Sequence, residues 1–139
     1  MIAVVDSNVL VAGLLSNRAD SPVVRILDGM CSATFPFAVS IDLISEYHRV
    51  LRYPKVARVH GFEDAQVNEL LSGLVTHAVV RESVAVDVDI DDPADVFLFE
   101  LLATLPSGVL VTGDKQLRRQ APNWASVVSP RAFVELLDH

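Results

Sequence analysis

Four carboxylates in this chain stand where a strand is expected to end or a helix to begin. They are Asp6 in IAVVDSNVL, Glu46 in IDLISEYHRVL, Asp95 in DDPADVFLFELL and Asp114 in GVLVTGDKQL. Asp6 and Asp114 follow short apolar runs, which predicts an acidic pocket at the carboxyl edge of a parallel sheet. Such a pocket is suited to holding Mg²⁺ or Mn²⁺ for phosphodiester chemistry.

The two aspartates that follow strands also have a purely structural interpretation, because an Asp in this place often caps the next helix. We favour a functional role for Asp6, since Ser7 and Asn8 add two oxygen-bearing side chains directly after it. Asp114 alone favours neither interpretation. Its pairing with Asp6 at another strand end favours function.

Glu46 lies on the helix predicted to start after Ser40. It falls three residues after Leu43 and four before Val50, in or beside the apolar stripe of that helix. A carboxylate there is costly unless a metal ion or another partner pairs with it. The alternative is a boundary residue that reaches solvent or pairs with Arg49 or Arg52.

Asp95 also has a strong structural alternative, because residues 92–95 fit a helix N-terminus with an acid in its first turn. However, Asp95 lies three residues before Leu98 and seven before Leu102, on the side expected to be buried. We therefore expect Asp95 to face the pocket and Asp92 to cap the helix. Asp92 is an additional candidate metal ligand.

The elements that would position these acids alternate between strands and helices. Strands are predicted at 2–5, 34–39, 78–80, 108–111 and 126–128. Helices are predicted at 8–15, 22–30, 41–52, 62–75, 93–105, 115–120 and 130–137. Part of the acidic connector 82–92 is predicted to form an edge strand, and 18–21 and 54–61 are expected to be flexible joints. The alternation predicts an α/β fold with a mostly parallel sheet covered on both faces.

Composition narrows the class of protein. The chain has 139 residues, 51% of them hydrophobic, and a mean hydropathy of +0.39, which predicts a single domain over 1–139. Its net charge of −7 argues against tight non-specific nucleic-acid binding unless metal ions or a local basic patch compensate. A single cysteine excludes an internal disulfide and a cysteine-based zinc site. Without a signal-like or bilayer-length apolar run, we expect a soluble cytoplasmic protein with no membrane association.

Four segments together carry a family resemblance: VVDSNVLVAGLL, LISEYHRVLRYPKV, DDPADVFLFELLA and VLVTGDKQL. With these segments in this order and spacing, the chain resembles the PIN-domain nucleases. More narrowly, it is similar to the PIN-family toxin components of toxin–antitoxin systems. The resemblance implies a three-layer α/β/α fold with a central, mostly parallel sheet of about four to five strands. It also implies Mg²⁺- or Mn²⁺-dependent hydrolysis of RNA.

The resemblance also implies roles for individual residues. Asp6, Glu46, Asp95 and Asp114 match the acidic catalytic and metal-binding positions of the family. Ser7 or Asn8 matches the small polar pair after the first Asp, and Thr112 matches the Thr before Gly-Asp. Gln116 departs from the pattern, because many relatives carry another Asp there, so the site has one carboxylate fewer and a second metal is in doubt.

RNA would have to reach this acidic site through local positive charge. The stretch 48–60 is the richest in basic residues, and a second basic group follows Asp114. The candidate RNA contacts are Arg49, Arg52, Lys55, Arg58, Lys115 and Arg118, with Tyr53 available for base stacking. The alternative is a solvated helix face or a contact with an acidic partner. The resemblance further implies a cognate antitoxin and a homodimer.

Three functions remain in competition. The leading hypothesis is a metal-dependent endoribonuclease that acts as a type II toxin. The second is a PIN-family RNA-processing nuclease without an antitoxin, and the third is a degenerate PIN module that binds RNA or protein without cleaving, which Gln116 keeps open. A phosphatase with Asp6 as nucleophile is less favoured, because Asn8 stands where its second Asp would be.

Overall fold

All strand pairings in the molecule are parallel. The computed structural model describes residues 1–139, with β1 (Ile2–Val5), β4 (Gly108–Val111) and β5 (Ser126–Val128) in the order β1-β4-β5. Strands β2 (Ala38–Val39) and β3 (Val79–Val80) form a second parallel pair, and a single bridge between Ala3 and Phe37 sets β2 beside β1. The predicted sheet of four to five mostly parallel strands is confirmed.

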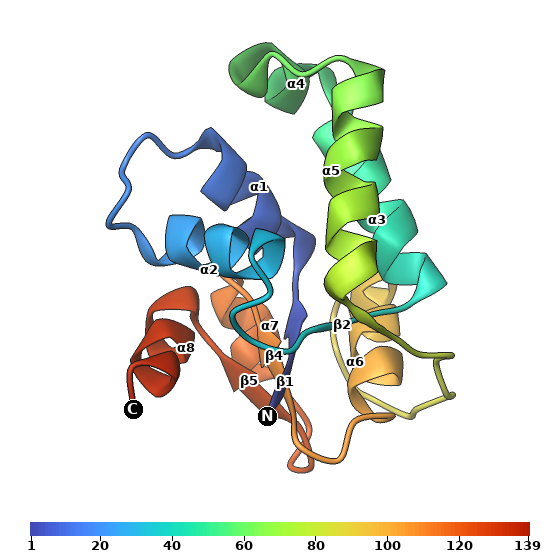
Figure 1. The fold of residues 1–139 in the computed structure, drawn as a ribbon. Helices are drawn as coiled ribbons and strands as arrows, with labels where there is room; N and C mark the ends of the chain where they lie inside the picture. Colours follow the sequence, from blue (N-terminus) through green and yellow to red (C-terminus); the bar gives the residue numbers. More distant parts are fainter.

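Helices lie on both sides of these strands, as the predicted three-layer architecture requires. They are α1 (Ser7–Leu15), α2 (Pro22–Cys31), α3 (Ile41–Leu51), α4 (Pro54–His60), α5 (Asp64–His77), α6 (Val96–Leu102), α7 (Lys115–Arg119) and α8 (Pro130–Leu137), with a 3₁₀ helix η1 (Pro93–Asp95) before α6. Figure 1 shows α1 and α2 on one side of β1, and α3, α5 and α6 on the other. Burial on both faces explains why β1 and β4 read as continuous apolar runs.

The order of the strands in space differs from their order along the chain. After β1, the chain forms β2 and β3 on one side of β1, and it then returns to form β4 and β5 on the other side. The register pairs Val5 with Val111, the last residues of β1 and β4. The next residues along each strand, Asp6 and Thr112, are therefore neighbours at the carboxyl edge, where open α/β sheets bind ligands.

Several predicted helix starts are confirmed at the level of hydrogen bonds. The Ser40 hydroxyl accepts a bond from the Leu43 N–H at 3.2 Å, and the Ser129 hydroxyl accepts one from the Ala132 N–H at 3.1 Å. Pro22 begins α2 directly after Ser21, whose side chain makes no capping bond. The two capping bonds fix the starts of α3 and α8.

Two segments differ from the sequence prediction. Residues 54–61, expected to be a flexible joint, form α4, because Pro54 occupies its first turn and Gly61, at φ 70°, ends it in the left-handed conformation. Residues 82–92 form no strand, and their contact with the nearest helix includes a bond from the Val84 N–H to the Glu100 carbonyl at 3.2 Å. No helix is long and apolar enough to cross a membrane.

Candidate active site

Asp6 is the buried centre of the candidate site. Its side chain is only 7% exposed, and its Oδ2 accepts hydrogen bonds from the Thr112 hydroxyl at 2.8 Å and from Asn8 Nδ2 at 3.3 Å. Asp6 precedes α1 but makes no capping bond with its side chain, so the capping interpretation does not describe it. Burial raises the pKa of Asp6, the bond from Thr112 opposes that rise, and the Asp114 and Glu46 charges add to it.

The small polar residues next to Asp6 connect the ends of β1 and β4. Asn8 accepts a bond from the Gly113 N–H at 3.2 Å through Oδ1, and Thr112 accepts one from the Asp114 N–H at 3.1 Å. Thr112 is fully buried, and Ser7 is 9% exposed at the start of α1. The predicted supporting residues Ser7, Asn8 and Thr112 therefore lie around Asp6 and hold the two strand ends together.

Asp114 has the structural role that the sequence left open. Its Oδ1 accepts bonds from the backbone N–H groups of Gln116 at 2.9 Å and Leu117 at 3.3 Å, so it caps α7. The same carboxylate is close enough for its charge to raise the pKa of both Asp6 and Asp95. Asp114 therefore caps a helix and also belongs to the acidic group.

Tyr47 positions the helix that carries Glu46. Its side chain is 1% exposed, and its hydroxyl donates a hydrogen bond to the Val5 carbonyl at the end of β1. This bond fixes α3 above the strand end from which Asp6 projects. Burial, with a smaller effect from the Asp6 charge, raises the pKa of Tyr47 far above its usual range. The sequence carries a signal for this anchor, because a tyrosine in the apolar stripe of a helix needs a polar partner for its hydroxyl when it is buried.

We expect Tyr47→Phe to lower the free energy of unfolding by about 1–3 kcal/mol, because the Val5 carbonyl would remain buried without its partner. Urea denaturation of both proteins measures the difference. Tyr53→Phe is the control, because Tyr53 is 42% exposed. Loss of the Tyr53 hydroxyl should lower the free energy of unfolding by less than about 0.5 kcal/mol. Equal stability of Tyr47→Phe and the unchanged chain would show that the hydroxyl is not an anchor.

Glu46 faces the site but is paired. A guanidinium nitrogen of Arg49 donates to Glu46 Oε2, three residues apart on α3, as the boundary interpretation anticipated. The Glu46 side chain is nevertheless only 22% exposed, and its charge raises the pKa of Asp6 and Asp95. Glu46 is thus both an ion-pair partner and a member of the acidic group.

Asp95 shows that the predicted acids converge. Burial, followed by the charges of Asp6, Asp92, Asp114 and Glu46 in that order, raises its pKa to about 6. The Asp92 side chain caps η1 by accepting the Ala94 N–H at 2.9 Å, as predicted, and leaves Asp95 to face the other acids. Five carboxylates from four separate segments therefore share one electrostatic environment.

The donor chemistry of this group suits a hard divalent cation, since Mg²⁺ and Mn²⁺ prefer carboxylate oxygens. As the side chains stand, no three acidic, imidazole or thiol groups converge closely enough to hold a metal ion. Two observations explain this: Asp114 is directed to the α7 backbone, and Glu46 is directed to Arg49. The acids do not line the five main hollows of the surface.

Gln116 has a role that the sequence did not reveal. Its Nε2 donates to Asp91 Oδ2 at 2.9 Å, and the Asp91 N–H donates to Gln120 Oε1, also at 2.9 Å. These bonds lower the pKa of Asp91 and fasten the end of the acidic connector to α7. Gln116 thus holds in place the segment that leads into Asp92 and Asp95.

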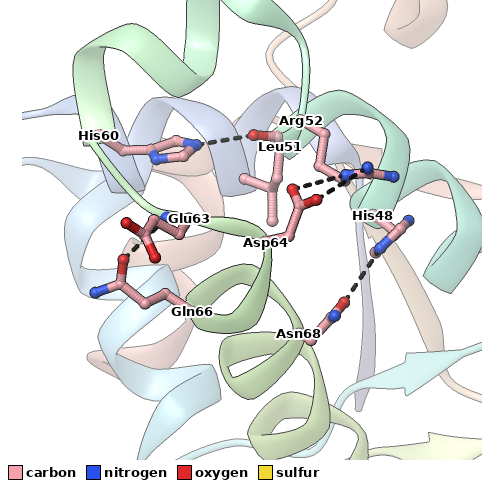
Figure 2. Close-up of polar contacts among 8 residues, drawn as sticks. All are labelled: His48, Leu51, Arg52, His60, Glu63, Asp64, Gln66 and Asn68. Atoms are coloured by element: carbon pink, nitrogen blue, oxygen red, sulfur yellow. Dashed lines mark hydrogen bonds and ion pairs between the residues drawn. The ribbon is translucent and has the colours of Figure 1, made fainter.

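The predicted RNA-binding stretch is largely engaged within the protein. Figure 2 shows Arg52 forming two bonds to Asp64, at 3.1 and 3.2 Å, and His48 facing Asn68 at 3.2 Å. His60 Nε2 lies 2.8 Å from the Leu51 carbonyl. These contacts connect α3, α4 and the start of α5. Because Asp64 already satisfies its guanidinium, Arg52 is a weaker candidate for phosphate binding than the sequence indicated.

The remaining predicted cations are less constrained. Lys55 and Lys115 are exposed and form no ion pair, and Arg58 donates to the Pro54 carbonyl at 3.2 Å within α4. Arg118 donates to the Thr112 carbonyl at 2.7 Å, which places its guanidinium beside the end of β4. Lys115 and Arg118 therefore lie on the short helix that Asp114 caps, next to the acids.

Comparisons with known proteins extend this description. The family model described as the PIN domain matches residues 3–116, a span that includes Asp6, Glu46, Asp95 and Asp114. Among solved structures, the chain is similar to the T. brucei RRP44 PIN domain, with 16% sequence identity and a TM-score of 0.49, over 96% of this chain and 79% of that chain. No curated protein matches the chain.

Proposed function

This chain belongs to the PIN-domain family, whose members are typically nucleases, and we propose that it is a Mg²⁺- or Mn²⁺-dependent endoribonuclease. The observation that carries the proposal is that Asp6 and Asp114 follow β1 and β4, and that their charges and that of Glu46 act on the Asp95 carboxyl. Their mutual repulsion raises the pKa of Asp95 beyond the effect of burial, to about 6. A divalent cation would relieve that repulsion.

The residues have distinct roles in this proposal. Asp6, Glu46 and Asp95 bind the principal metal ion, directly or through water, and Asp114 completes the site, with Asp92 as a further ligand. When bound, the ion lowers the pKa of its water and offsets the charge of the attacked phosphate. Thr112 and Asn8 orient the Asp6 carboxylate through the bonds at 2.8 and 3.3 Å. Such supporting partners fix the ligand geometry.

The RNA backbone would approach over the cations that lie nearest the acids. Lys115 and Arg118 on α7 lie directly after Asp114, and Lys55 is exposed on α4. A chain with a net charge of −7 needs such local positive charge to hold an RNA phosphate. Arg49 and Arg52 are secondary contacts, because each already pairs with a carboxylate, and Arg58 is one because its guanidinium donates to the Pro54 carbonyl within α4.

The biological role that we propose is that of the toxin in a type II toxin–antitoxin system, with the acidic edge covered by an antitoxin in the resting complex. The resemblance of the four acidic segments to PIN-family toxins supports this role. A neighbouring gene for a small DNA-binding protein that forms a complex with this chain would support it further. A nuclease that acts in RNA processing would have no such partner.

The direct test is cleavage of a panel of structured and single-stranded RNAs by the purified chain. We expect cleavage with Mg²⁺ or Mn²⁺, none with EDTA, and recovery when the metal is restored. Cleavage that EDTA leaves unchanged would contradict a metal-dependent site. Binding of Mn²⁺ measured by calorimetry, combined with RNA binding but no cleavage of any panel member, would favour a degenerate binding module instead.

A further inference from the structure

Arg49 is fixed between the acidic edge and an aromatic ring. One guanidinium nitrogen donates to Glu46 Oε2, and another donates to the hydroxyl of Tyr53. The guanidinium carbon lies 5.5 Å from the centre of the Tyr53 ring, within the range of a cation–π contact. Tyr53 stands directly before α4, so Arg49 connects the α3 turn that carries Glu46 to the start of the next helix.

Among the ion pairs of the molecule, this one alone includes a carboxylate of the proposed metal site. The others join Arg18 to Asp20, Arg25 to Asp138 and Arg52 to Asp64, and none of these three acids belongs to the proposed site. Asp95, by contrast, receives no hydrogen bond and has no cationic partner, and other carboxylates surround it. Arg49 is thus the cation that forms an ion pair with a carboxylate of the site.

We propose that Arg49 is an internal counter-ion that pairs with Glu46 in the metal-free protein and is displaced from it when a divalent cation binds. This inference rests on the proposed function, because it requires Glu46 to be a metal ligand. Glu46 Oε2 cannot direct the same lone pairs to a guanidinium and a metal ion. A guanidinium neutralises one carboxylate, whereas a divalent cation placed among the acids acts on Asp6, Asp95 and Glu46 together.

The surroundings of Arg49 make the displacement inexpensive. Its side chain is 56% exposed, and an exposed ion pair between residues three apart on a helix is weak. The bond to the Tyr53 hydroxyl and the ring contact remain after Glu46 is released, so the guanidinium stays at the rim of the site. There it meets an approaching RNA phosphate, which would account for a basic residue so close to the acids.

The test is Mn²⁺ binding measured by calorimetry at low salt on the full chain, with the substitution Arg49→Ala. If Arg49 competes with the metal for Glu46, its removal tightens Mn²⁺ binding by about 2- to 5-fold, the range expected for loss of an exposed ion pair. Arg52→Ala is the matched control, because it removes the same charge from an adjacent turn but from a pair with Asp64. It should leave the Mn²⁺ affinity within about 1.5-fold, since Arg52 pairs with an exposed acid that is not a proposed metal ligand.

A double-mutant cycle with Glu46→Gln separates competition from a general effect of charge. In the Glu46→Gln background, we expect Arg49→Ala to leave Mn²⁺ affinity unchanged. Equal tightening in both backgrounds, or no tightening in the unchanged background, would overturn the inference while leaving the proposed function intact. If the unchanged chain binds no Mn²⁺, the proposed function and this inference are both overturned.

Discussion

Replacement of Asp6 by Asn is expected to lower metal-dependent RNA cleavage by at least about 100-fold, because loss of even a residue that supports a metal ligand costs about 10- to 100-fold. Asp6 is 7% exposed, and its carboxylate accepts hydrogen bonds from the Thr112 hydroxyl and from Asn8 Nδ2. Asn has the same shape and keeps a carbonyl oxygen to accept the Thr112 hydroxyl. The substitution therefore removes the charge and a metal-binding oxygen while leaving the packing in place. Initial rates of RNA cleavage in Mn²⁺ measure the loss.

Asp87→Asn is the matched control for this experiment. It removes the same charge from an exposed position on the acidic connector, and we expect its cleavage rate to stay within about 2-fold of the unchanged chain, as for surface positions away from a site. Circular dichroism should show that both variants are folded. A folded Asp6→Asn chain with full activity would exclude Asp6 as a ligand and would require another arrangement of the site.

The strand ends were predictable from sequence because their signal is local. An apolar run followed by an acid, found at residues 2–6 and again at 108–114, specifies a buried strand and the polar residue just beyond it. The parallel pairing of Val5 with Val111 then brings Asp6 and Thr112 together without further information. The partial burial of Asp95 was predictable for a similar reason, since its spacing to the buried Leu98 and Leu102 sets its side of the helix.

The contacts that complete the site could not be predicted, because they join residues far apart or choose between equivalent partners. The bond from Tyr47 to the Val5 carbonyl depends on the position of α3 over the sheet. The pairing of Glu46 with Arg49 instead of Arg52 depends on Asp64, which lies on α5 and captures Arg52. In the sequence, Gln116 is notable only because many relatives carry an Asp there. Its bond to Asp91 depends on how the connector 82–92 packs against α7.

Helix α4 was missed although its signals were present. Pro54 was interpreted as the end of the preceding helix, which is correct for α3, but a proline is also well suited to the first turn of a new helix. Gly61, at φ 70°, is the matching C-terminal signal. The consequence for function is that Lys55 and Arg58 lie on an ordered helix, which presents them at fixed positions.

Replacement of Asp95 by Asn is expected to stabilise the metal-free protein at pH 7–8 by about 1–2 kcal/mol, after allowance for the partial exposure of the side chain. The pKa of Asp95 is about 6 in the folded chain, against 3.8 as its ordinary value. The ionised form is therefore disfavoured by folding, because burial and four nearby acids act on it. An acid near a helix N-terminus stabilises the helix by about 0.3–1 kcal/mol, which is less than the free-energy cost of ionising Asp95 in the folded chain.

The direction of the pH dependence follows from proton binding. Below pH 3.8 the Asp95 carboxyl is protonated in both the folded and the unfolded chain, so it has no effect on stability. Between about pH 4 and 6 the unfolded chain binds fewer protons than the folded one at this residue, and the free energy of unfolding falls as pH rises. Above that range the penalty is constant. The gain from Asp95→Asn should therefore be full at pH 7 and much smaller near pH 4.

Thermal unfolding at both pH values checks this prediction, with an expected rise of about 3–8 °C at pH 7 for a chain of this size. Asp87→Asn shows how much of that rise comes from reduced net charge alone. Saturating Mn²⁺, at about 100 times its dissociation constant, should stabilise the unchanged chain by about 2.7 kcal/mol at pH 7 but Asp95→Asn far less. A chain that becomes more stable without metal and less responsive to it would show that Asp95 is kept, at a cost in stability, for the cation. The same gain at pH 4 would show that the stabilisation does not come from charge at all.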